Sequence, residues 1–347
     1  MYKIFFELSI SKLSKTKSII LFITPRFFLV NKDDENIRKS FLNDFDIKSL
    51  SICMPFKSAV TENVITMLYI DKGKQDYIPV YNYNDTLQDF IAIEPVYIPY
   101  IKTKKLYEIV IGTSLDIIKT LVKIRNSAIP FGNIIVSKRG AEVSKDFVRK
   151  NNKGVKTLIG KDMKRYSIYW NNTYIPTNHK EYKRLNKFFI KKLIYLRRVD
   201  SCLEATISDI ERYAFTKNIY GILVNEKYNI YFVLGWLNSK ITNFYYKKCF
   251  SMKKEEVFPE IQSYLYEQLP FPNINFDNQI QKLKYDKVIE LVKQILDIKK
   301  QINITINKQE RQNLHDKTIT IDNEIDKIIY EFYDLTQEEI DIIESKV

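Results

Sequence analysis

The sequence predicts an α/β segment, then a mixed α+β segment, then a helical C-terminal tail. Three observations predict this order. Apolar runs of strand length occupy residues 18–24, 47–53 and 63–70, and a helical apolar period lies between the first two. Strand and helix patterns then alternate irregularly between about residues 133 and 272. From residue 278 onward, apolar residues recur at helical spacing.

The first segment predicts three strands and two helices. Residues 2–14 have a helical apolar period. Residues 18–24 form a near-continuous apolar run, so we expect a strand buried on both faces and ended by Pro25. A helix over 33–43 and strands over 47–53 and 63–70 follow. So few helices would leave one face of this sheet uncovered.

The middle of the chain has weaker patterns. Residues 71–130 contain Pro79, Pro95 and Pro99 and predict a connector with one helix over 115–124. In the α+β segment we expect strands over 133–137, 190–197 and 228–232 and a helix over 233–249. Residues 264–272 contain prolines and are expected to lead out of this segment.

The tail predicts helices over 278–302 and 322–333, and a capping box at 336–339 begins a last one. The predicted domains are therefore a partial α/β core (1–75), a connector (76–130), a mixed α+β domain (131–277) and a helical tail (278–347).

Positive charge is concentrated in one stretch of this basic chain, whose formal net charge is +13. Residues 151–200 hold thirteen Lys or Arg against three acids, whereas residues 278–347 hold eleven against fourteen. Such a concentration favours a polyanionic partner through phosphate neutralisation and counterion release. A generally lysine-rich composition is the alternative, but it does not explain the acidic tail.

Several classes of site are excluded by what the sequence lacks. The three cysteines are widely spaced and His179 and His315 are the only histidines, which argues against a zinc ribbon, a disulfide scaffold or a histidine-rich metal site. No apolar run reaches membrane-spanning length, so we expect a cytoplasmic protein without membrane contact. No Gly-x-Gly and no adjacent prolines occur anywhere.

Seven segments, in order, carry a family resemblance. They are SIILFITPRFFL (18–29), IRKSFLNDFDIKSL (37–50), PFKSAVTENVITMLY (55–69), LIGKDMKRY (158–166), LNSKITNFY (237–245), YLYEQLPFP (264–272) and IDKIIYEFYDLTQEEI (325–340). Together they resemble the C-terminal part of adenine-specific DNA methyltransferases of type IIG and related restriction–modification systems. Their specificity, or target-recognition, domain is of the TaqI-like C-terminal type.

The resemblance implies that residues 1–75 are the closing part of a Rossmann-like methyltransferase core. The cofactor glycine turn and the Asn-Pro-Pro-Tyr catalytic loop of that family are absent from this chain. We therefore expect no catalytic, cofactor-binding or metal-binding residue here. S-adenosylmethionine would be bound by a partner catalytic subunit or an N-terminal half. Phe56 matches the family position of an aromatic that stacks on the extruded adenine, although it could equally be a core residue.

Candidate DNA contacts lie mostly in basic loops and at the ends of predicted elements. Residues 160–166 place cations and an aromatic beside a glycine, so this loop could approach phosphates and offer Arg165 to a guanine edge, or it could be a solvated turn with Tyr166 in the core. Because adjacent strand residues face opposite ways, only one of Arg197 and Arg198 can face DNA, and we expect the other to pair with an acid. The candidates are Lys138, Arg139, Lys161, Lys164, Arg165, Tyr166, Arg197, Arg198, Lys247 and Lys248.

These features predict the double-stranded-DNA target-recognition half of a split or truncated adenine-specific methyltransferase that is inactive alone. A standalone sequence-specific DNA-binding protein without a role in methylation is the alternative. A structural role with incidental basic charge is a third. The split-enzyme hypothesis requires an adjacent reading frame with the missing motifs, and the structural one predicts no salt-dependent DNA binding.

Overall fold

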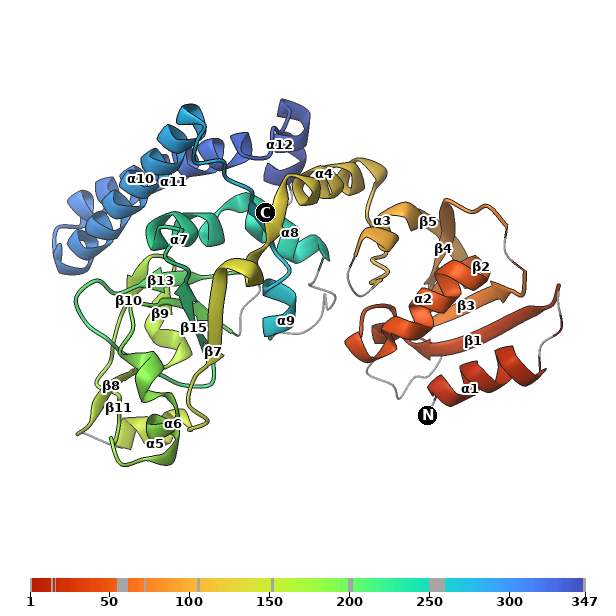
Figure 1. The fold of residues 1–347 in the computed structure, drawn as a ribbon, viewed down its shortest axis with the longest axis horizontal. Coiled ribbons are helices and arrows are strands. Elements are labelled where there is room, and N and C mark those ends of the chain that lie inside the picture. The colour runs from red at the N-terminus through yellow and green to blue at the C-terminus, as the bar shows by residue number, and fades with distance from the viewer. Residues whose placement is uncertain are drawn as a thin grey trace. The chain divides into compact units, whose positions relative to one another are not determined.

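The structure is a computed structural model that describes residues 2–13, 15, 17–54, 62–71, 73–104, 107–150, 153–198, 202–249 and 260–345. The chain divides into two compact units, Met1–Val122 and Lys123–Val347. Each unit is built around its own sheets (Figure 1).

The first unit holds a five-stranded sheet of order β1-β3-β2-β4-β5. Its elements are α1 (Tyr2–Leu8), the π-helical turn η1 (Ser9–Leu13), β1 (Ile19–Pro25), η2 (Arg26–Leu29), η3 (Lys32–Asp34), α2 (Glu35–Asp44), β2 (Asp46–Cys53), β3 (Asn63–Tyr69), β4 (Tyr77–Asn84), β5 (Asp89–Tyr97), α3 (Ile98–Thr103) and the first part of α4 (Leu115–Asn126). The three strands and the helix predicted over 33–43 are confirmed.

Strand β3 runs antiparallel to both β1 and β2, and β5 runs antiparallel to β4, so β2 and β4 form the sheet's one parallel pair. The coarse prediction of mixed sheets followed by a helical C-terminus is confirmed. The narrower prediction of a Rossmann-like core stays a prediction.

One face of this sheet is packed under α1 and α2. Phe6 of α1 lies 5.0 Å from the ring of Phe41 of α2, 5.4 Å from Phe28 and 4.1 Å from Phe22 of β1, measured between ring centroids. This aromatic cluster continues into Val64 and Leu68 of β3, so alternate residues of β1 and β3 supply the core.

The opposite side of β1 is uncovered. Ile19, Leu21 and Ile23 are 57%, 57% and 46% exposed. The prediction that β1 is buried on both faces was therefore wrong, because α1 and α2 cover only the side of Phe22. The expectation that one face of the sheet is uncovered agrees with the exposure of these three side chains.

Residues 76–130, for which a connector was predicted, contain the strands β4 and β5, which the sequence did not predict. They form a hairpin whose register shifts between Ile78 and Val80, opposite Ile93 and Val96. Pro79 and Pro95 both fall inside this irregularity, where a proline removes no regular ladder hydrogen bond. The prolines therefore mark a bulge rather than the absence of strands.

Among its described residues, the second unit contains four small sheets and most of the helices. Its elements are the end of α4, β6 (Ala128–Pro130), η4 (Phe131–Ile134), β7 (Ile135–Arg139), α5 (Lys145–Lys150), β8 (Val155–Leu158), η5 (Gly160–Asp162), β9 (Met163–Lys164), β10 (Ser167–Ile168), β11 (Tyr174–Ile175), α6 (Lys180–Phe189), β12 (Ile194–Arg197), β13 (Ala205–Ile207), β14 (Ala214–Phe215), β15 (Ile219–Val224), α7 (Ile230–Asn238), α8 (Lys240–Cys249), α9 (Ser263–Tyr266), β16 (Pro270–Pro272), α10 (Gln279–Ile304), α11 (Lys308–Glu331) and α12 (Gln337–Glu344). The sheets have orders β13-β12-β15-β7, β11-β8-β14, β10-β9 and β16-β6.

Two predictions around α7 were wrong. Residues 228–232 enter a helix rather than a strand, because the side chain of Asn229 accepts a hydrogen bond from the Tyr231 N–H and caps α7. The single helix predicted over 233–249 is two helices that break at Ser239, whose backbone is extended (φ −69°, ψ 156°). The Asn238 side chain there pairs with the backbone of Ala205 instead of facing solvent.

The helical tail packs within the second unit. Helices α10 and α11 lie side by side, and α10 packs on α7 (Figure 1). A Cβ at Gly235 would lie 2.7 Å from Val292 Cγ2, so glycine allows these two helices to approach closely. The predicted capping box is confirmed, with Thr336 N–H donating to Glu339 at 2.8 Å.

None of the helices in the described part of the chain combines the length and the apolar composition that a membrane span requires. The same described residues contain no group of three His, Cys, Asp or Glu side chains that could hold a metal ion.

Candidate nucleic-acid interface

A hollow rich in cations lies where η5, α5 and the loop after β14 meet. Its volume is about 530 Å³. Its lining residues are Val143, Ser144, Lys145, Asp146, Arg149, Ile159, Gly160, Lys161, Arg197, Thr216, Lys217 and Asn218.

A second hollow of about 470 Å³ lies beside the first, at the end of β7. Lys138, Arg139, Gly140, Glu142, Arg184 and Leu185 line it. Glu142 joins the two hollows, since its carboxylate is 2.7 Å from Lys217 Nζ and 3.3 Å from Arg139 Nη2. We call the two hollows together the basic cleft; eight basic and two acidic side chains line it.

Close backbone packing at Gly140 builds the centre of the basic cleft. The Gly140 N–H donates to the Ile219 carbonyl at 3.0 Å, and the Ala141 N–H donates to the Phe215 carbonyl at 2.8 Å. A Cβ at Gly140 would lie 2.4 Å from the carbonyl oxygens of Phe215 and Thr216, so only glycine fits. This approach brings Arg139 and Lys217 together although 78 residues separate them.

The buried carboxylate of Asp162 stabilises the turn that carries Lys161. Asp162 is 1% exposed and accepts a hydrogen bond from the Ile159 N–H at 2.9 Å. Burial raises the pKa of Asp162. The turn is therefore well supported, and Lys161 remains exposed at its tip.

Half of the basic residues of the cleft were predicted from the sequence: Lys138, Arg139, Lys161 and Arg197. As the alternation of strand side chains predicts, the neighbouring arginines diverge. Arg197 lines the cleft and pairs with Glu204 at 3.1 Å, whereas Arg198 is 8% exposed and pairs with Glu260.

Arg165 and Tyr166 require a correction. Arg165 Nη2 donates to the Asn238 carbonyl at 2.6 Å and to Asp322 Oδ1 at 2.8 Å, and its Nη1 also contacts the Asp322 carboxylate. Tyr166 is 3% exposed. The proposed guanine reader is thus engaged by a carboxylate 157 residues further along the chain, which no local pattern could reveal.

The remaining predicted residues lie apart from the cleft lining. Lys164 is exposed on β9, and Lys247 and Lys248 are half-buried in the last turn of α8. Phe56 lies outside the described residues.

Four cations of the cleft were missed: Lys145, Arg149, Arg184 and Lys217. Lys145 and Arg149 are four residues apart on α5, and this spacing would have placed both on one helix face. Lys217 joins the cleft only through the contact at Gly140, for which the sequence carries no signal.

Comparisons with known proteins identify a domain family for part of the second unit. Residues 155–271 match the family model of the TaqI-like C-terminal specificity domain. The match covers Lys161, Arg184, Arg197 and Lys217 of the basic cleft. No curated protein matches the chain.

Among solved structures, the type IIL restriction-modification enzyme MmeI, determined in complex with DNA, is similar with a TM-score of 0.53 at 10% identity, covering 94% of this chain and 49% of MmeI. The type IIG restriction endonuclease BpuSI matches with a TM-score of 0.36 at 13% identity, covering 95% of this chain and 49% of BpuSI. The chain thus spans about half the length of these enzymes. Over residues 155–271, the predicted resemblance to the TaqI-like C-terminal specificity domain is confirmed.

Proposed function

We propose that this chain recognises the DNA target of an adenine-specific methyltransferase of a restriction–modification system, and that the basic cleft binds the DNA backbone. The observation that carries the proposal is the excess of eight basic over two acidic side chains in the cleft. Arginine and lysine beside close-packed backbone are suited to phosphate contacts, which fix the register of a protein on duplex DNA. The specificity-domain match and the fold shared with MmeI support it.

Removing two cleft cations tests this proposal. We expect the chain to bind duplex DNA with a log–log salt slope of about −4 to −5, which corresponds to roughly four to six phosphate contacts. Lys145→Gln with Arg149→Gln removes two cations from the same face of α5, so the slope should become shallower by about 1–2. Fluorescence anisotropy at several salt concentrations measures both quantities.

The matched control is Lys308→Gln with Lys317→Gln, an equal change of charge on the exposed side of α11. It should leave the slope within error of the parent chain. Equal losses in both double variants would mean that only net charge matters, and the basic cleft would lose its assigned role.

We further propose that the first unit docks onto a methyltransferase catalytic subunit, or onto an N-terminal half, that carries the S-adenosylmethionine site. Strand β1 is an edge strand of its sheet, and Ile19, Leu21 and Ile23 form an exposed apolar row on it. Edge strands with exposed apolar residues favour pairing with another strand. This row favours the split-enzyme hypothesis over a standalone DNA-binding protein. Phe56 is proposed to stack on the extruded adenine in the assembled enzyme.

The chain alone is expected to bind no S-adenosylmethionine and to methylate no DNA. The reason is chemical: the sequence holds neither a Gly-x-Gly turn nor an Asn-Pro-Pro-Tyr loop to accept the adenine amino group. Isothermal titration with the cofactor measures uptake, and an adenine methyltransferase that contains both motifs serves as the positive control. Micromolar cofactor affinity of the chain would contradict this prediction.

A further inference from the structure

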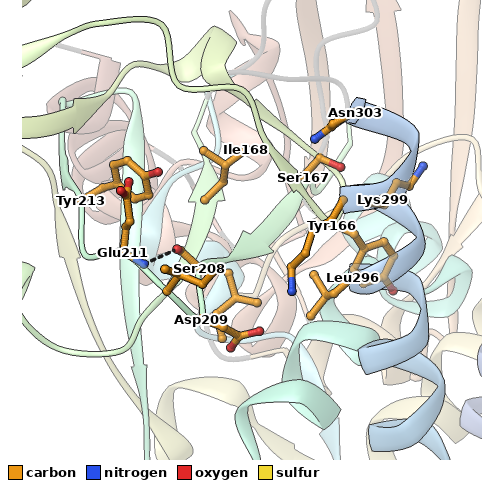
Figure 2. Close-up of a pocket in the computed structure, with 13 residues that line it drawn as sticks. Tyr166, Ser167, Ile168, Ser208, Asp209, Glu211, Tyr213, Leu296, Lys299 and Asn303 are labelled. Carbon is orange, nitrogen blue, oxygen red and sulfur yellow. Dashed lines mark hydrogen bonds between the residues drawn. The ribbon is translucent and has the colours of Figure 1, made fainter. Parts of the chain in front are cut away.

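A separate pocket of about 320 Å³ lies between β10 and the C-terminal third of α10. Figure 2 shows Ser167, Lys299 and Asn303 grouped at one end, with Glu211 and Tyr213 at the other. None of its lining residues belongs to the basic cleft.

The polar end of this pocket holds two side chains that make no hydrogen bond or ion pair with any described residue. Ser167 is 6% exposed, and its Oγ makes no hydrogen bond with any described residue. Leaving a buried hydroxyl unsatisfied costs about 1–3 kcal/mol, so a ligand oxygen there would be favourable.

Lys299 is the second of these side chains. It is half-buried and makes no hydrogen bond or ion pair within the described part of the chain. Burial, followed by the nearby charge of Arg165, lowers the pKa of Lys299, while the charge of Asp322, which is itself paired with Arg165, partly opposes this shift. An anion bound beside Lys299 would therefore stabilise its charged form.

The other charged groups that line the pocket are already paired. Asp209 lies 2.9 Å from Lys192 Nζ and accepts a hydrogen bond from Tyr231. Glu211 pairs with Lys156, and Lys300 lies 3.0 Å from Asp297. Among the described lining residues, Lys299 is therefore the one charge left without an opposite charge within salt-bridge distance.

We propose that this pocket binds a phosphate group, with Lys299, Ser167 and Asn303 as its hydrogen-bond donors. A phosphate offers enough oxygens to accept from an ammonium, a hydroxyl and an amide together. Ile168, Leu296 and Tyr213 line the rest of the cavity and lower the local dielectric, which strengthens the charged contact. The phosphate belongs either to a free phosphate monoester or to the backbone of a DNA strand.

The test compares Lys299→Met and Ser167→Ala with the parent chain. Lys308→Met removes the same charge from an exposed position on α11 and serves as control. Binding of inorganic phosphate and of deoxyadenosine monophosphate is measured by titration calorimetry, and binding of duplex DNA by anisotropy. Thermal unfolding checks that each variant folds. Because each substitution removes a hydrogen bond to a charged group, each pocket variant should lose about tenfold or more of its phosphate affinity.

The two sources give different results. Weaker binding of inorganic phosphate or the mononucleotide with unchanged DNA binding assigns the pocket to a free phosphate ligand. Weaker DNA binding by both pocket variants, but not by Lys308→Met, assigns it to the DNA backbone.

Unchanged affinity of both variants for all three ligands, or equal losses in the Lys308→Met control, would overturn the proposal. The proposal is independent of the basic cleft. A chain that binds phosphate through Lys299 but no DNA would uphold it while contradicting the proposed function.

Discussion

Replacing Arg165 by alanine is expected to lower the free energy of unfolding by about 2–4 kcal/mol and to leave the preference for DNA bases unchanged. The substitution removes the partner of the Asp322 carboxylate and of the Asn238 carbonyl. A buried ion pair that loses one partner usually costs about 3–5 kcal/mol. We lower this figure because the Arg165 side chain is 36% exposed and the Asp322 side chain 16%.

Urea unfolding of the variant, measured at two pH values, checks this result. Burial raises the pKa of Asp322, and Arg165 opposes that rise. Without Arg165 the carboxylate can take up a proton, so the loss of stability should be smaller at pH 5 than at pH 8. Lys164→Ala, at the exposed neighbouring position, should change stability by less than about 0.5 kcal/mol.

A different outcome would restore the role predicted from sequence. If Arg165→Ala unfolds like the parent chain and relaxes the preference at one base position, Arg165 reads DNA after all, with a cost of about 1–3 kcal/mol at that base.

The second large effect concerns Asp326 of α11. Burial raises the pKa of Asp326 to about 7. Its Oδ1 accepts a hydrogen bond from the Lys240 N–H at 2.8 Å, but its buried Oδ2 has no hydrogen-bond partner among the described residues. The charged form is therefore poorly satisfied in the folded protein.

The direction of the pH dependence follows from this shift. The carboxyl binds a proton more tightly when folded than when unfolded, where its pKa is near 3.8. The resulting stability is fully present below pH 4 and is lost as pH rises through about 7. A difference of about three pKa units corresponds to roughly 4 kcal/mol as an upper limit.

Asp326→Asn should remove this pH dependence and raise the free energy of unfolding at pH 8 by about 1–3 kcal/mol. Asparagine keeps an oxygen for the Lys240 N–H without a charge. Asp316→Asn, at an exposed position on the same helix, serves as control. Lower stability of Asp326→Asn at pH 8 than that of the parent chain would mean that the ionised carboxylate is needed, with Lys240 Nζ at 3.8 Å as its partner.

Local patterns predicted the elements whose formation depends on near neighbours in the chain. Apolar runs of strand length placed β2 and β3, and the capping box at Thr336 placed the start of α12. The same logic failed at Asn229, where a side-chain cap outweighed strand propensity, and at Pro79, where a bulge accommodates proline. Each failure involves one residue with two allowed local structures, between which the pattern of apolar residues does not choose.

The sequence by itself determined that this chain resembles a DNA specificity domain, that it lacks a cofactor turn, and that its cations concentrate in one region. Ordered motifs and charge counts need no coordinates. Only the tertiary structure decided which cations face a common surface. Arg165 is engaged by Asp322, 157 residues away, while Lys217 reaches Arg139 because Gly140 lets two backbone segments meet. Contacts over such separations depend on how sheets and helices pack, which the period of a strand or helix does not encode.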